Sequence, residues 1–349
     1  MKIAQVAPLA ESVPPKLYGG TERVVSWLTE DLVRRGHHVT LFASGDSETR
    51  AELVPVVPRA LRCDPNVKDY QPYNLLLVDQ VYQRAEEFDV IHFHIDMIHY
   101  PMFRALADRV ITTLHGRLDV PDLKLFYRAF AELPLVSISQ AQRKPLPPVN
   151  WLATVYHGLP KNLCRPCANA RGDYLAFVGR ICPEKGIEDA IAIARRTGIP
   201  LKIGAKVDPV DRAYFEARIE RELDDPLIEY LGEVNDAEKN ELLGNALAML
   251  FPICWPEPFG LVMIEAAACG TPVIAYPCGS VPEIVEDNVT GFLVRNVEEA
   301  VHAVTRVRML DRNVIRRRFE YRFTVEQMTA KYLDVYRRLL DSRLAFAAA

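Results

Sequence analysis

The sequence predicts an α/β protein made of two doubly wound domains, and three observations lead to this prediction. The chain has 349 residues, more than a single hydrophobic core usually serves. Short apolar runs alternate with amphipathic stretches, the pattern of a parallel sheet covered by helices on both faces. The alternation lapses at residues 160–173, where Pro, Asn, Cys, Arg and Gly give the composition of a linker.

The first predicted domain comprises residues 1–165. Val24, Leu28 and Leu32 recur at four-residue spacing and predict a helix over residues 21–35. The expected strands are residues 3–8, 38–43, 90–93, 110–114, 135–138 and 154–156.

The second predicted domain, residues 166–324, repeats the alternation, and an amphipathic helix within residues 325–349 follows it. We expect that helix to cross the domain junction and return toward the first domain. The expected strands are residues 174–178, 201–203, 228–231, 248–251, 272–275 and 291–294. The expected helices are residues 187–196, 211–223, 236–246, 259–269, 297–308 and 325–344.

Composition excludes several classes of protein. Hydrophobic residues at 49% and charged residues at 25% are ordinary globular values, and a net charge of −4 gives no general attraction to nucleic acid. The chain begins without a leader pattern and contains no run of eighteen apolar residues, so we expect a cytoplasmic location. Seven cysteines fit reduced thiols; only Cys164 and Cys167 have ligand spacing, and no second such pair completes a zinc site.

Glu257 and Glu265 bracket an apolar segment that leaves a strand and enters a helix. Carboxylates in such a setting need partners. If residues 259–269 are helical, eight residues separate the two by about 12 Å. The free amides of the first turn, near Gly260, Leu261 and Val262, favour an anionic, polyhydroxylated ligand. The alternative is a surface Glu and a helix Glu with no joint role.

Arg180 and Lys185 flank the first strand-to-helix turn of the second domain. Two cations that converge on one point match the charge of a diphosphate. The alternative for Arg180 is an exposed ion pair with Glu184.

Further candidates follow strands of the first domain. The paired Gly19 and Gly20 before a helix let amides approach a phosphate, although a tight turn explains them equally well. His94 and His115 suit a hydroxyl contact or a proton relay better than a metal site, because a third ligand is not evident; a structural role stays open. Asp96 is a candidate base on the acceptor side.

These residues together resemble the retaining glycosyltransferases of family 4, which have the GT-B fold of two Rossmann-like domains facing each other across a cleft. The resemblance extends from the first strand to Gly291, and its glutamate pair with the preceding G-R-x4-K-G is specific in combination. The motifs that carry it are Gly19-Gly20, His115-Gly116, Gly179-Arg180, Glu184-Lys185-Gly186, Glu257-Pro-Phe-Gly-Leu, Glu265 and Gly270-Thr271-Pro272-Val273-Ile274.

The resemblance implies a role for each matching residue of the second domain. Arg180 and Lys185 hold the nucleotide diphosphate, Glu265 takes the ribose hydroxyls and Glu257 approaches the donor sugar. The nucleotide base lies against the backbone of residues 231–234. Within that stretch, Val234 contacts the base. The amides that reach the sugar and phosphates belong to Phe259, Gly260, Leu261 and Val262.

In the first domain, the resemblance places His115 beside the transferred sugar and brings the loop of Gly19 and Gly20 over the donor. Three departures concern local geometry. They are Cys164 and Cys167 in the linker, Asn288 where a Gly is common, and an inverted Ala-Gly order in residues 202–206.

The predicted activity is transfer of a hexose from a UDP-, GDP- or ADP-linked sugar to a sugar, lipid or small-metabolite acceptor. Retention follows from the resemblance. We expect no cofactor and no metal, because the sequence has no D-x-D pair. Lys124, Arg128, Arg143 and Lys144 allow weak peripheral membrane contact, although a solvated face is the favoured interpretation. The oligomeric state is open.

Three other classes of protein could carry a pair of carboxylates on this fold or bind a sugar. A glycoside hydrolase needs carboxylates about 5 to 9.5 Å apart, less than the helical spacing of about 12 Å. A sugar-nucleotide epimerase on the same fold needs no acceptor. A non-catalytic sugar-binding protein needs no convergent cations.

Overall fold

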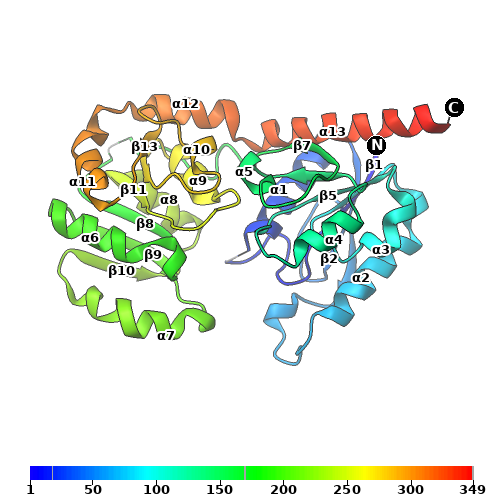
Figure 1. The fold of residues 1–349 in the computed structure, drawn as a ribbon, viewed down its shortest axis with the longest axis horizontal. Helices are drawn as coiled ribbons and strands as arrows, with labels where there is room; N and C mark the ends of the chain where they lie inside the picture. The colour runs from blue at the N-terminus through cyan, green and yellow to red at the C-terminus, as the bar shows by residue number, and fades with distance from the viewer. Residues whose placement is uncertain (18, 169, 348–349) are drawn as a thin grey trace. The chain divides into compact units, whose positions relative to one another are not determined.

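The computed structural model describes residues 1–17, 19–168 and 170–347 and confirms the predicted α/β class (Figure 1). The chain forms two compact units. Unit 1 is Met1–Gly158 with Val325–Ala349, and unit 2 is Leu159–Thr324. The division lies between Gly158 and Leu159, ahead of the position expected from composition at residue 165.

Unit 1 contains a seven-stranded parallel sheet with the order β3-β2-β1-β4-β5-β6-β7. The strand order reverses between β1 and β4, as in doubly wound sheets. The strands are β1 Lys2–Val6, β2 His38–Ser44, β3 Glu52–Val57, β4 Val90–Phe93, β5 Val110–Thr113, β6 Leu135–Ser137 and β7 Trp151–Thr154.

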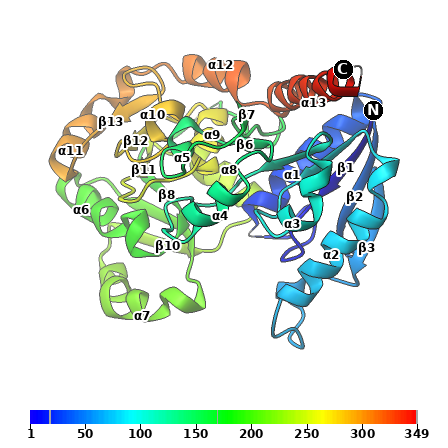
Figure 2. The same cartoon turned by 45° about the vertical axis from the view of Figure 1, so that its right-hand side comes forward.

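Helices cover both faces of this sheet. Alternate residues of a strand point to opposite faces. Ala4 and Val6 of β1 therefore pack in the core that contains α2, while α13 packs beside α1 and reaches the opposite face (Figure 2). The helices are α1 Gly20–Arg34, α2 Gln71–Gln83, α3 Tyr100–Phe103, α4 Leu123–Ala129, α5 Gln140–Arg143 and α13 Val325–Ala347.

Unit 2 contains a six-stranded parallel sheet with the order β10-β9-β8-β11-β12-β13. Here the order reverses between β8 and β11. The strands are β8 Leu175–Arg180, β9 Leu201–Lys206, β10 Ile228–Gly232, β11 Ala248–Phe251, β12 Val273–Ala275 and β13 Gly291–Leu293.

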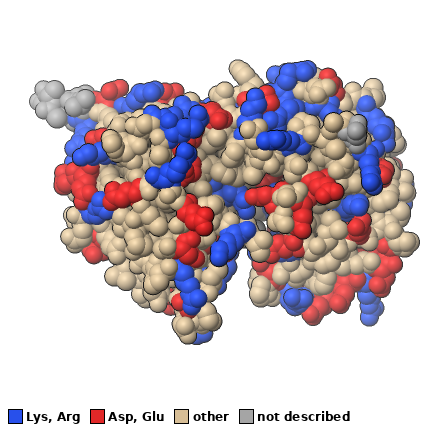
Figure 3. All heavy atoms as spheres, turned by 180° about the vertical axis from the view of Figure 1, so that it is seen from behind, with Lys and Arg blue, Asp and Glu red and all other residues tan. Residues whose placement is uncertain are grey.

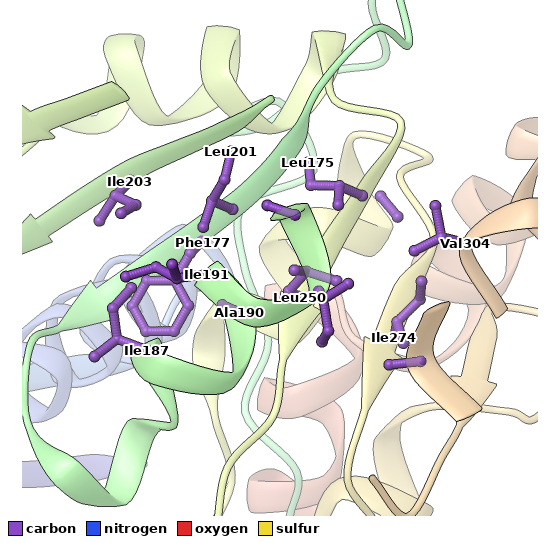
Figure 4. Close-up of a cluster of buried hydrophobic side chains, with 14 of the residues drawn as sticks. Leu175, Phe177, Ile187, Ala190, Ile191, Leu201, Ile203, Leu250, Ile274 and Val304 are labelled. Carbon is purple, nitrogen blue, oxygen red and sulfur yellow. The ribbon is translucent and has the colours of Figure 1, made fainter. Parts of the chain in front are cut away.

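The core of unit 2 lies between this sheet and helices α6 and α11. Figure 4 shows Phe177 and Leu201 of the sheet beside Ile187 and Ile191 of α6, all of them buried. The helices are α6 Ile187–Thr197, α7 Arg212–Tyr214, α8 Asp236–Asn245, α9 Leu261–Ala268, α10 Val281–Ile284, α11 Val297–Arg306 and α12 Arg312–Arg322.

The predicted elements at residues 211–223 and 154–156 differ in the structure. The helix expected at residues 211–223 is the short α7 followed by a π-helical and a 3-10 segment. Only Phe215 and Ile219 of this stretch are buried, so packing does little to enforce one helical register. The strand expected at residues 154–156 is β7, which ends at Thr154. This edge strand is only partly buried, and its apolar run begins at Trp151, ahead of the predicted start.

Asn288, which stands where the family commonly has Gly, has a left-handed backbone with φ 59°. Asn tolerates this conformation better than most residues, so the turn keeps its shape.

The surface is of mixed charge. Basic and acidic side chains are interspersed over the face shown in Figure 3. Among the helices of the described ranges, none has both the length and the apolar character needed to cross a bilayer.

We predict unequal stability losses from alanine at the two glycines that flank α6. Gly186 has φ 72°, and a Cβ there would lie 2.0 Å from the Pro252 carbonyl oxygen. Gly198 has φ 66° and open space around it. Gly198→Ala should cost about 1 kcal/mol for the left-handed backbone, and Gly186→Ala about 3 kcal/mol because overpacking is added. Urea unfolding measures both; equal losses would contradict the close approach.

Candidate active site

The carboxyl ends of β8 and β11 define the candidate site in unit 2. Strand order reverses between these neighbours, and ligands of doubly wound sheets bind beyond the carboxyl ends of strands at such a point. Arg180 ends β8, Lys185 ends the 3-10 turn Pro183–Lys185, and Glu257 follows β11. Gly186 keeps the turn against the Pro252 carbonyl, which fixes Lys185 beside the loop after β11.

Lys185 and Glu257 form an ion pair. The Lys185 Nζ lies 2.5 Å from Glu257 Oε2, and the Trp255 Nε1–H donates to the same oxygen at 3.2 Å. The ammonium also lies over the rings of Phe251 and Trp255, at 5.7 and 5.5 Å. Glu257 is only 9% exposed, so this pairing satisfies a largely buried carboxylate.

Arg180 contacts three carboxylates. Its guanidinium donates to Glu184 at 2.8 Å and lies 3.5 Å from Asp208 and 3.4 Å from Asp211. The ion pair with Glu184, the alternative interpretation of the sequence, is therefore present. Burial opposes charge on Asp208, but Lys206 and Arg180 outweigh it and lower the pKa of this carboxyl. Sequence analysis missed the two aspartates, which follow the next strand, β9.

Glu265 is buried in α9 and pairs with Lys239 of α8. The Nζ lies 2.5 Å from Glu265 Oε1 and 3.3 Å from Asp236. Sequence analysis missed Lys239. A signal was present, because a buried glutamate requires a cation and Lys239 lies in the first turn of the predicted helix over residues 236–246.

The start of α9 corrects one prediction. Gly260 has a left-handed backbone with φ 81°, so the helix begins at Leu261 and not at Phe259. Glu257 lies outside the helix, and the helical spacing of about 12 Å between Glu257 and Glu265 does not apply. The exclusion of a glycoside hydrolase cannot rest on that distance.

The segment before α9 is held by its backbone. The Ser280 N–H donates to the Glu257 carbonyl at 2.9 Å, and the Ser280 hydroxyl donates to the Phe259 carbonyl at 2.8 Å. The Phe259 side chain is buried, with its ring 6.3 Å from that of Phe323. Phe259 therefore offers only its backbone to a ligand. Leu261 and Val262 open α9, where N–H groups have no partner within the helix.

Val234 lies in the loop between β10 and α8, beside the backbone of β9. A Cβ on Gly204 would lie 3.0 Å from Val234 Cγ2. Gly204, the glycine of the inverted Ala-Gly order, thus makes room for Val234, which is predicted to contact the base.

In unit 1, the predicted residues lie beyond β1, β4 and β5. Gly19 precedes α1, and Gly20 is its first residue; Tyr18, the predicted neighbour of this pair, lies outside the described residues. Asp96 follows β4, is exposed and has φ 54°. His115 follows β5.

His94 and His115 contact each other. The His94 Nδ1 lies 2.8 Å from His115 Nε2, and the His94 Nε2 lies 2.8 Å from Gln5 Oε1. Burial lowers the pKa of His115 to about 3, so the ring is neutral. Sequence analysis missed Gln5, although a lone amide in an apolar strand signals a buried hydrogen bond.

The basic residues considered for membrane contact differ in their surroundings. The Arg143 Nε donates to Ser137 Oγ at 2.7 Å, and its guanidinium lies over the Trp151 ring at 5.0 Å. Lys124, Arg128 and Lys144 are exposed.

Comparisons with known proteins identify the class. The family model described as "Glycosyl transferases group 1" matches residues 168–321, and that described as "Glycosyltransferase Family 4" matches residues 18–155. O-antigen chain mannosyltransferase C of Escherichia coli is 24% identical over 370 residues, which cover 94% of this chain and 97% of its own.

Two solved structures share the fold. Sucrose-phosphate synthase from Thermosynechococcus elongatus has a TM-score of 0.75 at 21% identity, with 100% of both chains covered. Anabaena HepE, in complex with UDP and glucose, has a TM-score of 0.72 at 18% identity, with 96% of this chain and 98% of its own covered.

The protein is therefore a glycosyltransferase with the GT-B fold. It belongs to glycosyltransferase family 4, as the resemblance in sequence predicted.

We predict that Lys239→Met lowers the free energy of unfolding by about 3 kcal/mol, because it leaves the buried Glu265 carboxylate without its cation. Lys202→Met is the matched control, since Lys202 pairs at 2.9 Å with the exposed Glu229 and should cost at most about 1 kcal/mol. Chemical denaturation at neutral pH checks both. A Lys239→Met loss no larger than the control's would contradict a buried pair.

Proposed function

We propose that the enzyme transfers a hexose from a nucleotide diphosphate sugar to an acceptor, with retention of the α configuration and without a metal ion. The observation that supports this most directly is the gathering of Arg180, Lys185 and Glu257 at the reversal of strand order in unit 2. A site with two cations and a carboxylate suits a ligand that joins a diphosphate to a sugar.

The cations stabilise the leaving diphosphate in this proposal. Arg180 exchanges its contacts with Glu184, Asp208 and Asp211 for phosphate oxygens, whose charge is larger and which suit a guanidinium fork. Lys185 adds a point charge, and the amides that open α9 add aligned dipoles. Charge that develops on the departing oxygen is thus met by fixed donors.

The two glutamates have separate tasks. One carboxylate oxygen of Glu257 accepts a hydrogen bond from a hydroxyl of the donor sugar. Lys185 and Trp255 hold the other oxygen, Oε2. Glu265 accepts hydrogen bonds from the ribose diol while Lys239 holds its carboxylate in place. Val234 lies against the base. In unit 1, His115 contacts the transferred sugar, the loop of Gly19 and Gly20 covers the donor, and Asp96 serves as the acceptor-side base.

The relatives support a hexose, since one is named as a mannosyltransferase and HepE was solved with UDP and glucose. No carboxylate is an evident covalent nucleophile, so we propose same-face attack assisted by the leaving phosphate. The acceptor is a sugar, a lipid or a small metabolite.

The division of labour between the glutamates predicts opposite binding results. Glu265→Ala should weaken the affinity for free nucleoside diphosphate by roughly tenfold to a hundredfold. The reason is that hydrogen bonds to a charged group contribute about 1.5 to 3 kcal/mol. Glu257→Ala should change that affinity less than about twofold and lower kcat for transfer, because its contact is to the sugar. Isothermal titration with UDP, GDP and ADP measures the first effect and a transfer assay the second. Equal loss of nucleotide affinity in both variants would refute this assignment.

Metal independence predicts full transfer activity in excess EDTA, because Arg180, Lys185 and the α9 amides supply the positive charge. The measurement is turnover with and without chelator, using a panel of nucleotide sugars. Loss of turnover that manganese restores would reject this part of the proposal. Incubation with donor alone is the control: slow release of free sugar supports a transferase, and an epimer of the donor supports an isomerase.

A further inference from the structure

Unit 1 contains a buried polar network on the sheet face that α13 covers. Alternate strand residues share a face, so His92 of β4 points the same way as His94 just after it, and Thr113 of β5 the same way as His115. Gln5 of β1 joins them, and α13 contributes two tyrosine hydroxyls one turn apart. The network consists of Gln5, His92, His94, Thr113, His115, Tyr332 and Tyr336.

The amide of Gln5 is held from both sides. Its Nε2 donates to the Tyr336 hydroxyl at 3.1 Å, and its Oε1 lies 2.8 Å from His94 Nε2. The Tyr336 hydroxyl is 2.7 Å from His92 Nδ1, and His92 Nε2 is 2.7 Å from Thr113 Oγ1. Every contact is satisfied when Tyr336 donates to His92 and His92 donates to Thr113.

This arrangement fixes the protons on the two remaining histidines. A neutral imidazole has one donor and one acceptor nitrogen. Because the Gln5 oxygen can only accept, His94 carries its proton on Nε2 and accepts through Nδ1. His115 must then donate to it from Nε2, 2.8 Å away, which leaves His115 Nδ1 without a proton.

The result of this proton arrangement is an acceptor at His115 Nδ1. This nitrogen is buried and has no hydrogen-bond partner among the described residues. The ring stacks on His157, with centroids 5.2 Å apart and planes 14° apart. Burial keeps the pKa of both His94 and His115 below the usual range, so neither ring takes a second proton near pH 7. A buried acceptor without a donor is unfavourable, and a hydrogen bond from a ligand hydroxyl would remove this cost.

We propose that Gln5 and His94 are positioning residues that hold His115 as the Nε2–H tautomer, so that its Nδ1 accepts a hydrogen bond from a hydroxyl of the sugar. The identity of the ligand rests on the proposed function. The tautomer does not, because it follows from contacts within unit 1.

Nitrogen NMR of the full chain labelled with 15N-histidine tests the tautomer directly. The His115 signals are assigned by their loss in His115→Gln. Near pH 7 the expected result is a protonated Nε2 and an unprotonated Nδ1. A His115 ring protonated at Nδ1 overturns the proposal.

Two variants of α13 test the role of the Gln5 amide. Tyr336→Phe removes the acceptor of the Gln5 Nε2–H, so the amide can turn and the second tautomer of His115 should appear. Tyr332→Phe is the matched control. It removes a tyrosine hydroxyl one helical turn away, which contacts Thr113 and not Gln5. The His115 tautomer should not change there. Equal behaviour of the two variants contradicts positioning through Gln5.

Substitution of His94 tests the effect on transfer. His94→Leu removes the acceptor for the His115 Nε2–H and should lower kcat/KM by roughly tenfold, the loss of one hydrogen bond. His94→Asn keeps an oxygen acceptor near the same place and should recover most of that loss. Affinity for free nucleoside diphosphate should match wild type in both. Wild-type kcat/KM in His94→Leu refutes the sugar contact.

Failure of the proposed function gives a different result. If wild type transfers no sugar from any donor of the panel while NMR shows the Nε2–H tautomer, the function is wrong and the positioning of His115 is upheld.

Discussion

The pairing of Lys185 with Glu257 is the interaction on which the arrangement of unit 2 depends. Lys185 lies in the turn after β8 and Glu257 in the loop after β11. These two segments are far apart in the chain but meet where the strand order reverses. The pair is nearly buried, and removing either member would leave an uncompensated charge. Gly186 is tied to the same requirement, because only a residue without a side chain lets the turn approach the Pro252 carbonyl.

The same geometry recurs in unit 1 with neutral groups. Strand order reverses between β1 and β4, and His94 and Gln5 form a side-chain contact between those strands at this edge. Where the strand order reverses, unit 2 has the charged side chains of Lys185 and Glu257, and unit 1 has the hydrogen bonds of His94 with Gln5 and His115. In our proposals the first suits a diphosphate and the second suits hydroxyl groups, the two halves of a sugar nucleotide.

The fold was predictable because hydrophobic periodicity is a local property. Alternation of apolar runs and helices located the sheets and most of their strands. The glutamates were predictable as candidates because carboxylates that bracket an apolar segment need partners, and Arg180 and Lys185 because they flank a strand-to-helix turn. Their partners were not. The contacts of Glu265 with Lys239 and of Arg180 with Asp208 join separate elements, and periodicity carries no information about which elements become neighbours. The start of α9 was misplaced because one backbone angle at Gly260 overrides an apolar run that extends into the helix.

The return of α13 to unit 1 has a consequence for biosynthesis. Unit 2 is an insertion between the two segments of unit 1, so the chain emerges from the ribosome with the first sheet complete and its covering helix still to be made. Gln5 and His92 leave the exit tunnel before unit 2 is made, whereas Tyr336, which contacts both of them, follows unit 2 in the chain. Unit 1 therefore reaches its native hydrogen bonding only after the whole of unit 2 has been synthesised.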